Sequence, residues 1–216
     1  MPDRSGAPPR AWQRMLSGRR LDLLDPSPLD IELADIAHGL ARVARWNGQT
    51  RGDHAYSVAQ HSLLVERIAM MRRPASAPAE RLTALLHDAP EYVIGDIISP
   101  FKAVLGGRYK AVEQRLLAAI RIRYGLPPEP PRPLAAAVKR ADQVAAYLEA
   151  TMLAGFSDAE ARRYFGRPEE FASGDLGDLL EPWSAVRAES RYIEAVAVQA
   201  AQIGSMAERS EIAASG

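Results

Sequence analysis

The stretch Ala-Leu-Leu-His-Asp-Ala-Pro-Glu, residues 84–91, places a His-Asp doublet in an apolar helical run and a further carboxylate one turn on. Imidazole and carboxylate groups are poor core residues, because each needs a partner once it leaves water. His87 and Glu91 are four positions apart, and Asp88 and Glu91 three, so all three can project toward one side of a helix. Pro90 is expected to kink or end that helix. The stretch is therefore a candidate site for a metal or a phosphate.

Composition narrows the class of protein. The 216 residues are 47% hydrophobic and 25% charged, enough for one globular core. The 27 lysines and arginines balance 27 aspartates and glutamates, so overall charge gives no case for a nucleic-acid or membrane-surface partner. There is no cysteine, which excludes disulfides, thiolate ligands and a cysteine nucleophile. The sequence shows no signal-peptide pattern and no run of roughly 20 apolar residues, so we expect a cytoplasmic protein.

Apolar periodicity predicts an all-α fold, an orthogonal helical bundle. Residues 1–24 are expected to form an N-terminal arm, disordered at its start, with either a small hairpin or an extended segment after it. Residues 25–205 are expected to form a single domain and 206–216 a C-terminal tail. Asp30 is the expected N-cap of the first helix. The predicted helices cover residues 31–46, 55–71, 79–90, 101–125, 134–154, 158–165 and 182–205.

Only four histidines occur, so a metal site built on imidazole has few choices. His61 and His87 are the best pair, because each lies on or beside an apolar helical stripe, where an unpartnered imidazole is costly. A core histidine bonded to a backbone carbonyl is the competing interpretation. For His38 we favour a structural hydrogen bond. His54 fits the rim of a pocket and an exposed loop equally well.

Asp142 is a candidate for a further ligand, because it lies at the edge of the buried stripe of the helix 134–154. The alternative is an exposed helix aspartate paired with Lys139. A mixed nitrogen and oxygen set of this kind is suited to Mn²⁺, Co²⁺, Fe²⁺, Zn²⁺ or Mg²⁺. The complete candidate set is His61, His87, Asp88 and Asp142.

These residues resemble the signature of the HD-domain metal-dependent phosphohydrolases, which is a histidine, a His-Asp doublet and a distant aspartate. The resemblance is closest to the small, single-domain 5′-deoxynucleotidase-like branch and covers roughly residues 35–151. The glutamate and the Gly-Asp pair that follow the doublet make the match specific. The matching segments are 56–62 (YSVAQHS), 86–91 (LHDAPE), 95–97 (GDI) with Pro100 and Lys102, and 139–142 (KRAD).

The resemblance implies that the two histidines and two aspartates hold one divalent metal, with positions left for water and a phosphate oxygen. It implies that Glu91 helps to activate the water, and that Asp96 orients it or bonds to Glu91. Arg45 and Trp46 correspond to the Arg-Trp segment that lines the nucleotide pocket in this branch, and Lys102 would reach the phosphate. Physical chemistry agrees, since a divalent cation with an open coordination position supplies what phosphoester hydrolysis needs.

With this resemblance, the sequence predicts a phosphomonoesterase that removes the 5′-phosphate from nucleoside monophosphates, preferring 2′-deoxynucleotides and discriminating little among bases. The partner is this small molecule, not a nucleic acid or a membrane, and exposed C-terminal helices suggest a homo-oligomer, a dimer or higher. A deoxynucleoside triphosphate hydrolase with the same metal site is one alternative, since the metal ligands do not indicate how many phosphates the substrate carries. The other is a non-catalytic nucleotide-binding HD protein, against which the intact Glu91 and Asp96 argue. Cyclic dinucleotide phosphodiesterases and alarmone hydrolases fit less well.

Overall fold

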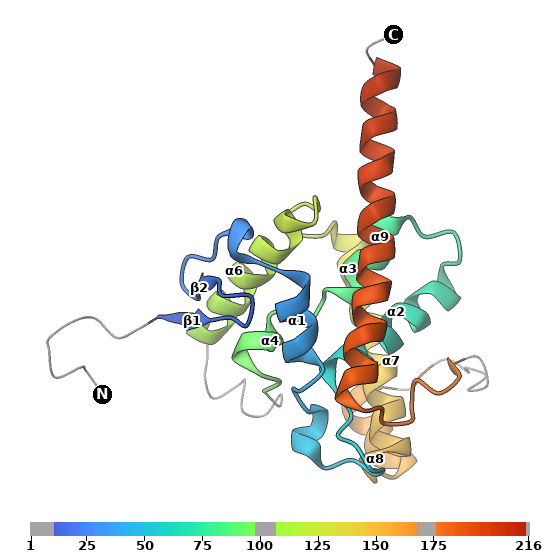
Figure 1. Cartoon of the computed structure of the whole chain (residues 1–216). Coiled ribbons are helices and arrows are strands. Elements are labelled where there is room, and N and C mark those ends of the chain that lie inside the picture. The colour runs from blue at the N-terminus through green and yellow to red at the C-terminus, as the bar shows by residue number, and fades with distance from the viewer. Residues whose placement is uncertain (1–10, 98–106, 167, 169–175, 215–216) are drawn as a thin grey trace, which may run out of the picture.

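The structure is a computed structural model that describes residues 11–97, 107–166, 168 and 176–214, with the backbone alone described at 108 and 207–214. It confirms an all-α bundle with a short N-terminal hairpin (Figure 1). The hairpin consists of β1, Trp12–Arg14, and β2, Arg20–Asp22, paired antiparallel with Gln13 opposite Leu21. None of the helices in these ranges combines the length and the apolarity needed to cross a membrane.

The helices differ in length and in how closely they follow the sequence pattern. Those predicted over 55–71, 134–154 and 158–165 are confirmed, with ends moved by three residues or fewer. The helix predicted from 182 continues past 205 through Ala214. The 3₁₀ segments are η1, Pro28–Asp30, and η2, Arg45–Gly48. The α-helices are α1 Leu33–Leu40, α2 Val58–Arg72, α3 Pro78–Leu85, α4 Glu91–Ile94, α6 Gly107–Arg123, α7 Arg132–Met152, α8 Asp158–Phe165 and α9 Ala185–Ala214.

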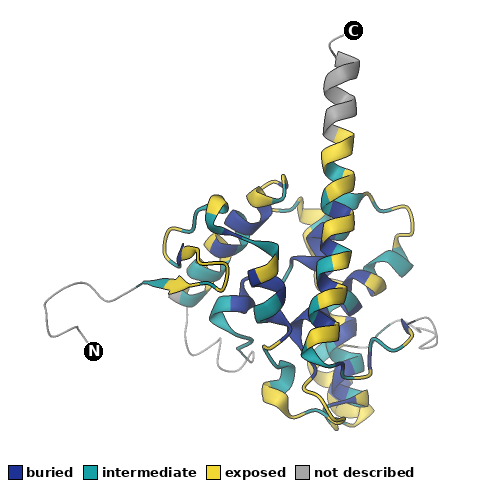
Figure 2. Ribbon diagram, viewed as in Figure 1, coloured by how far each residue is buried: buried dark blue, intermediate teal, exposed yellow. Residues whose placement is uncertain are grey.

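Helix α2 lies at the centre of the bundle and packs against α3, α7 and α9. It contributes to both buried apolar clusters, with Val58 and Ala59 in one and Leu64 and Ile68 in the other. Buried residues gather where these helices face one another (Figure 2). Helix α9 extends beyond the other helices toward the C-terminus, and residues 201–206 are mostly exposed. A polar side chain on the inner face of α2 is therefore surrounded by protein.

The first predicted helix, 31–46, is wrong in its length and its cap. Helix α1 ends at Leu40, and Asp30 belongs to η1 instead of capping α1. The chain then leaves the helical path because its backbone groups bond to the start of α2. Arg45 N donates to Tyr56 O at 2.8 Å, and Val58 N donates to Val43 O at 3.0 Å. These bonds satisfy backbone groups that a continued helix would have paired internally.

The doublet also lies outside a helix, in contrast to the expectation. Helix α3 ends at Leu85, and residues 86–90 form turns that lead to α4. Pro90 has no N–H to continue the helical ladder, so the helix stops within the turn before it. His87, Asp88 and Glu91 therefore do not share the face of one helix, and the direction of each side chain is set by the turn.

Contact between α1 and α4 depends on Gly39. A Cβ atom at this position would stand 2.7 Å from Tyr92 O and 2.8 Å from Tyr92 Cβ. We expect Gly39→Ala to lower the free energy of unfolding by about 1–3 kcal/mol, the usual cost of overpacking. Urea denaturation followed by circular dichroism measures it.

Gly204→Ala is the matched control for Gly39→Ala. Gly204 lies in α9 and a Cβ there would meet nothing within 4 Å. Because glycine is a poor helix former, we expect this variant to be more stable by about 0.5–1 kcal/mol. An unfolding midpoint of Gly39→Ala at or above that of the wild type would contradict the packing of α1 on α4.

Candidate metal centre

Four side chains from three parts of the chain meet beside α2. His61 comes from the first turn of α2, His87 and Asp88 from the turn between α3 and α4, and Asp142 from α7. One ligand atom from each residue lies within 4.8 Å of those of the others. The structure thus brings together all four residues of the predicted set. Such a group could hold a metal ion.

The nitrogen atoms of the two histidines differ in their surroundings. His87 Nδ1 donates to Ala84 O at 2.8 Å, and His61 Nδ1 lies 2.5 Å from Glu149 Oε1. The Nε2 atoms of both rings are buried and have no hydrogen-bond partner among the described residues. An unsatisfied buried polar atom costs about 1–3 kcal/mol. A cation between the two rings would satisfy both atoms, so the donors fit a metal.

The two aspartates face these unpartnered nitrogens. Asp88 Oδ2 lies 3.5 Å from His61 Nε2 and 3.2 Å from His87 Nε2, and Asp142 Oδ1 lies 3.4 Å from His61 Nε2. Asp142 Oδ2 also accepts from Lys139 at 2.6 Å. Both interpretations of Asp142, the ligand and the partner of Lys139, are therefore compatible with one conformation.

Electrostatics keeps the aspartates in the form that binds a cation. Burial raises the pKa of Asp88, but His87 and His61 outweigh burial and hold that pKa well below its ordinary value. Burial likewise raises the pKa of Asp142, but the neighbouring His61 outweighs burial and lowers it overall. Burial and Arg45 lower the pKa of His61, yet the surrounding carboxylates raise it well above its ordinary value. The site is thus an anionic environment that attracts positive charge.

The turn that carries the doublet is fixed from α9. Tyr192 is fully buried, and its hydroxyl donates to Leu85 O at 3.0 Å, at the last residue of α3. On the other side, the Ser57 hydroxyl accepts from Gln60 N at 3.2 Å and caps α2 four residues before His61. Both histidines therefore project from backbone segments whose ends are held by hydrogen bonds.

The other predicted site residues differ in their surroundings. Glu91 begins α4 and is 2% exposed. Asp96 accepts from Arg45 Nη1 at 3.2 Å, which ties it to η2. Trp46 packs against Phe156 and Phe165, with ring centroids 5.5 and 5.7 Å away. Lys102 lies outside the described residues.

Sequence reasoning missed Glu149. This glutamate of α7 is fully buried, and its carboxylate accepts from Trp46 Nε1 at 2.8 Å and from Arg45 Nε and Nη2 at 3.3 Å each. Burial raises the pKa of Glu149, but Arg45 and His61 outweigh burial and lower it. A signal was present, because Glu149 follows Asp142 by two helical turns and so lies on the same face of an amphipathic helix.

The remaining histidines lie apart from the centre. His38 Nδ1 is 3.5 Å from Glu189 Oε2, a carboxylate that Arg42 also binds at 2.6 Å. This contact between α1 and α9 agrees with a structural role for His38. His54 is exposed in the loop before α2.

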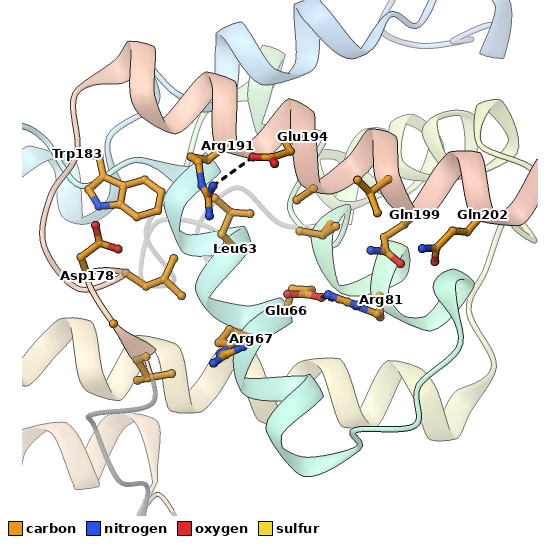
Figure 3. Close-up of a pocket in the computed structure, with 16 residues that line it drawn as sticks. Leu63, Glu66, Arg67, Arg81, Asp178, Trp183, Arg191, Glu194, Gln199 and Gln202 are labelled. Atoms are coloured by element: carbon orange, nitrogen blue, oxygen red, sulfur yellow. Dashed lines mark hydrogen bonds and ion pairs between the residues drawn. The ribbon is translucent and has the colours of Figure 1, made fainter.

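A cavity of about 700 Å³ lies elsewhere, between α2, α3, α9 and the segment 176–183 (Figure 3). None of the four candidate ligands lines it. Its α2 residues, Leu63, Glu66 and Arg67, are about 140–240° around the helix from His61. Arg191 and Glu194 form an ion pair at 3.2 Å on its wall. The cavity is therefore separate from the metal centre.

Comparison with known proteins identifies relatives. No family model matches the chain. An uncharacterized protein of Rhodobacter capsulatus is 59% identical over 179 residues, which cover 83% of this chain and 91% of that protein. The uncharacterized protein YfdR of Escherichia coli is 40% identical over 100 residues, 46% of this chain and 50% of YfdR. Neither description names a reaction.

Proposed function

The chain belongs to one family with the Rhodobacter capsulatus protein, and we propose that it is a metal-dependent phosphohydrolase that removes the 5′-phosphate from nucleoside monophosphates. The observation that carries the proposal is the pair of buried, unpartnered Nε2 atoms of His61 and His87, which face the carboxylates of Asp88 and Asp142. Two imidazoles and two carboxylates suit a divalent cation of the Mn²⁺, Co²⁺, Fe²⁺, Zn²⁺ or Mg²⁺ type. The resemblance of the sequence to the HD-domain phosphohydrolases supports the same chemistry.

The proposed roles divide between holding the cation and moving a proton. When bound, a divalent cation neutralises phosphoryl charge and makes water a better nucleophile at neutral pH. Glu91, beside the doublet, is the proposed general base. It would take a proton from the water as the water oxygen bonds to phosphorus, while the bond between phosphorus and the nucleoside 5′-oxygen breaks and that oxygen takes up the proton. General acid–base groups typically contribute about 10²- to 10⁴-fold to rate. Asp96, held by Arg45, is proposed to orient the water.

The products that are released identify the substrate of this proposed site. Orthophosphate released from nucleoside 5′-monophosphates in a metal-supplemented panel of mono-, di- and triphosphates supports the proposal. Release of triphosphate or pyrophosphate from a deoxynucleoside triphosphate, with monophosphates untouched, overturns it in favour of a triphosphate hydrolase. Nucleotide binding without turnover overturns it in favour of a non-catalytic binding protein.

We propose that 2′-deoxynucleotides are preferred over ribonucleotides because of Trp46. A flat indole beside the sugar excludes a 2′-hydroxyl, or leaves it buried without a partner at a cost of about 1–3 kcal/mol. That penalty corresponds to about 5- to 150-fold discrimination. Trp46→Ala is expected to shift the ratio of kcat/KM values toward ribonucleotides by a factor within this range.

The ratio of kcat/KM for ribonucleotides to kcat/KM for 2′-deoxynucleotides separates selection of the sugar from a general loss of activity. Trp46 also donates to Glu149, so the alanine variant is expected to lose activity on both sugars, and this shared loss cancels in the ratio. Trp12→Ala, in the N-terminal hairpin far from η2 in sequence, is the control and should leave the ratio unchanged. An unchanged ratio in Trp46→Ala, or a wild type that prefers ribonucleotides, rules out this role.

A further inference from the structure

We propose that Glu149 is the positioning residue of the metal centre, which fixes the orientation of His61 and links it to the Arg45–Trp46 segment. The inference rests on the metal centre of the proposed function. It assigns a role to a residue that the motif segments 56–62, 86–91, 95–97 and 139–142 do not include.

Each of the two carboxylate oxygens of Glu149 has to accept hydrogen bonds. Oε1 lies 2.5 Å from His61 Nδ1. Oε2 accepts from Trp46 Nε1 at 2.8 Å and from Arg45 Nε and Nη2 at 3.3 Å each. Indole and guanidinium nitrogens only donate. An ionised carboxylate, which accepts at both oxygens, is the side chain that satisfies all of these partners at once.

From this arrangement we infer which nitrogen of a neutral His61 carries the proton. Because the carboxylate accepts, the proton of a neutral His61 stays on Nδ1, and the lone pair of Nε2 points at Asp88 and Asp142. A histidine ligand needs this state. Carboxylates behind ligating histidines hold ring orientation in the same way in metal sites generally.

The same carboxylate joins the metal ligand to the predicted substrate segment. Arg45 reaches Glu149 with Nε and Nη2, and reaches Asp96 with Nη1 at 3.2 Å. The side chains of His61 and Glu149 are 0% exposed, Asp96 9% and Arg45 13%. Charged contacts thus run without interruption from Asp96 to His61, away from bulk water. We therefore expect a change at His61 to alter the surroundings of Arg45 and Trp46.

Glu149→Gln tests the positioning role because it keeps the shape of the side chain and replaces one accepting carboxylate oxygen by a donating NH₂ group. The amide oxygen is expected to face the donors of Arg45 and Trp46, which are more numerous. The amide NH₂ then faces His61 Nδ1, which has to accept, and the proton moves to Nε2. The variant is expected to bind Zn²⁺ about 10- to 100-fold more weakly than the wild type, the usual effect of losing such a partner.

The measurement is calorimetric titration of the 216-residue chain with Zn²⁺ alone, without substrate. Glu149→Asp retains a charged acceptor and is expected to bind Zn²⁺ more tightly than Glu149→Gln. Glu66→Gln is the matched control, because Glu66 is 9% exposed, is paired with Arg81 at 2.6 Å and lies on the far side of α2. Its Zn²⁺ affinity should equal that of the wild type.

Two further readouts distinguish positioning from general destabilisation. In the Zn²⁺-loaded wild type, ¹⁵N NMR is expected to show the His61 proton on Nδ1. Zn²⁺ should also change the tryptophan emission through Trp46, and Trp46→Phe should abolish that change while Trp12 and Trp183 remain. An emission change that persists in full in Trp46→Phe overturns the link to η2.

The outcomes separate this inference from the proposed function. Zn²⁺ affinity equal to that of the wild type in Glu149→Gln overturns the positioning role even in an active phosphatase. Loss of affinity in that variant, with no nucleotide hydrolysed by the wild type, supports the positioning role and contradicts the proposed function. If Glu149→Gln fails to fold, ¹⁵N NMR of the Zn²⁺-loaded wild type decides, and a His61 proton on Nε2 overturns the inference. A wild type that does not bind Zn²⁺ overturns the positioning role, whereas the proposed function is overturned only if none of the five cations supports release of orthophosphate.

Discussion

Replacing His87 or Asp88 by alanine is expected to remove the bound metal and the phosphatase activity together. The four candidate ligands lie within 4.8 Å of one another, so the loss of one leaves an incomplete set around the cation. His87→Ala leaves one imidazole with two aspartates, and Asp88→Ala leaves two imidazoles with one aspartate. Metal analysis of the purified variants, with turnover measured on the same samples, checks both losses.

His54→Ala is the control for the ligand variants. His54 is a histidine exposed in the loop before α2, so its loss should change neither the metal content nor the rate. Full stoichiometric metal in both the His87 and the Asp88 variants would falsify the ligand assignment. Metal loss in His54→Ala to the same degree would show that the assay reports non-specific binding.

Glu91→Gln is expected to keep the metal and lower kcat by about 10²-fold or more, as when a proton-transfer group is lost. Glu91 begins α4 and is 2% exposed, and it is not one of the four grouped ligands. The amide is nearly isosteric with the carboxylate but cannot take the proton from water. Turnover on a 2′-deoxynucleoside 5′-monophosphate and metal content are measured together.

Glu66→Gln controls for the loss of a nearly buried glutamate. Glu66 pairs with Arg81 outside the metal centre, so this variant should turn over at the wild-type rate. Turnover of Glu91→Gln close to that of the wild type eliminates Glu91 as the general base. Loss of metal from Glu91→Gln would instead make it a ligand.

Local signals predicted the parts of the fold and site that local chemistry decides. The apolar stripe of the helix predicted over 55–71 placed His61 on its inner face, where it is fully buried. Asp142 was predicted at the edge of such a stripe on α7. The residues that supply ligands from regular helices were therefore accessible from periodicity.

The sequence pattern did not show where two helices end or which residues bond to Glu149. Apolar periodicity continues past Leu40, but α1 ends there because the chain after it pairs with the start of α2. Periodicity also continues through the doublet, and Pro90 decides where α3 stops. Glu149 bonds to partners 88 to 104 positions away in the sequence. No local pattern identifies such partners.

Orthophosphate release by the 216-residue chain, stripped of metal by a chelator and then resupplied, tests metal-dependent phosphatase action most directly. The substrate is a 2′-deoxynucleoside 5′-monophosphate, and Co²⁺, Mn²⁺, Fe²⁺, Zn²⁺ and Mg²⁺ are added separately. We expect no release from the stripped protein, release with at least one of these ions, and none with any of them in His61→Ala. Release from the stripped protein at the resupplied rate, or no release with any ion, would contradict the proposed function.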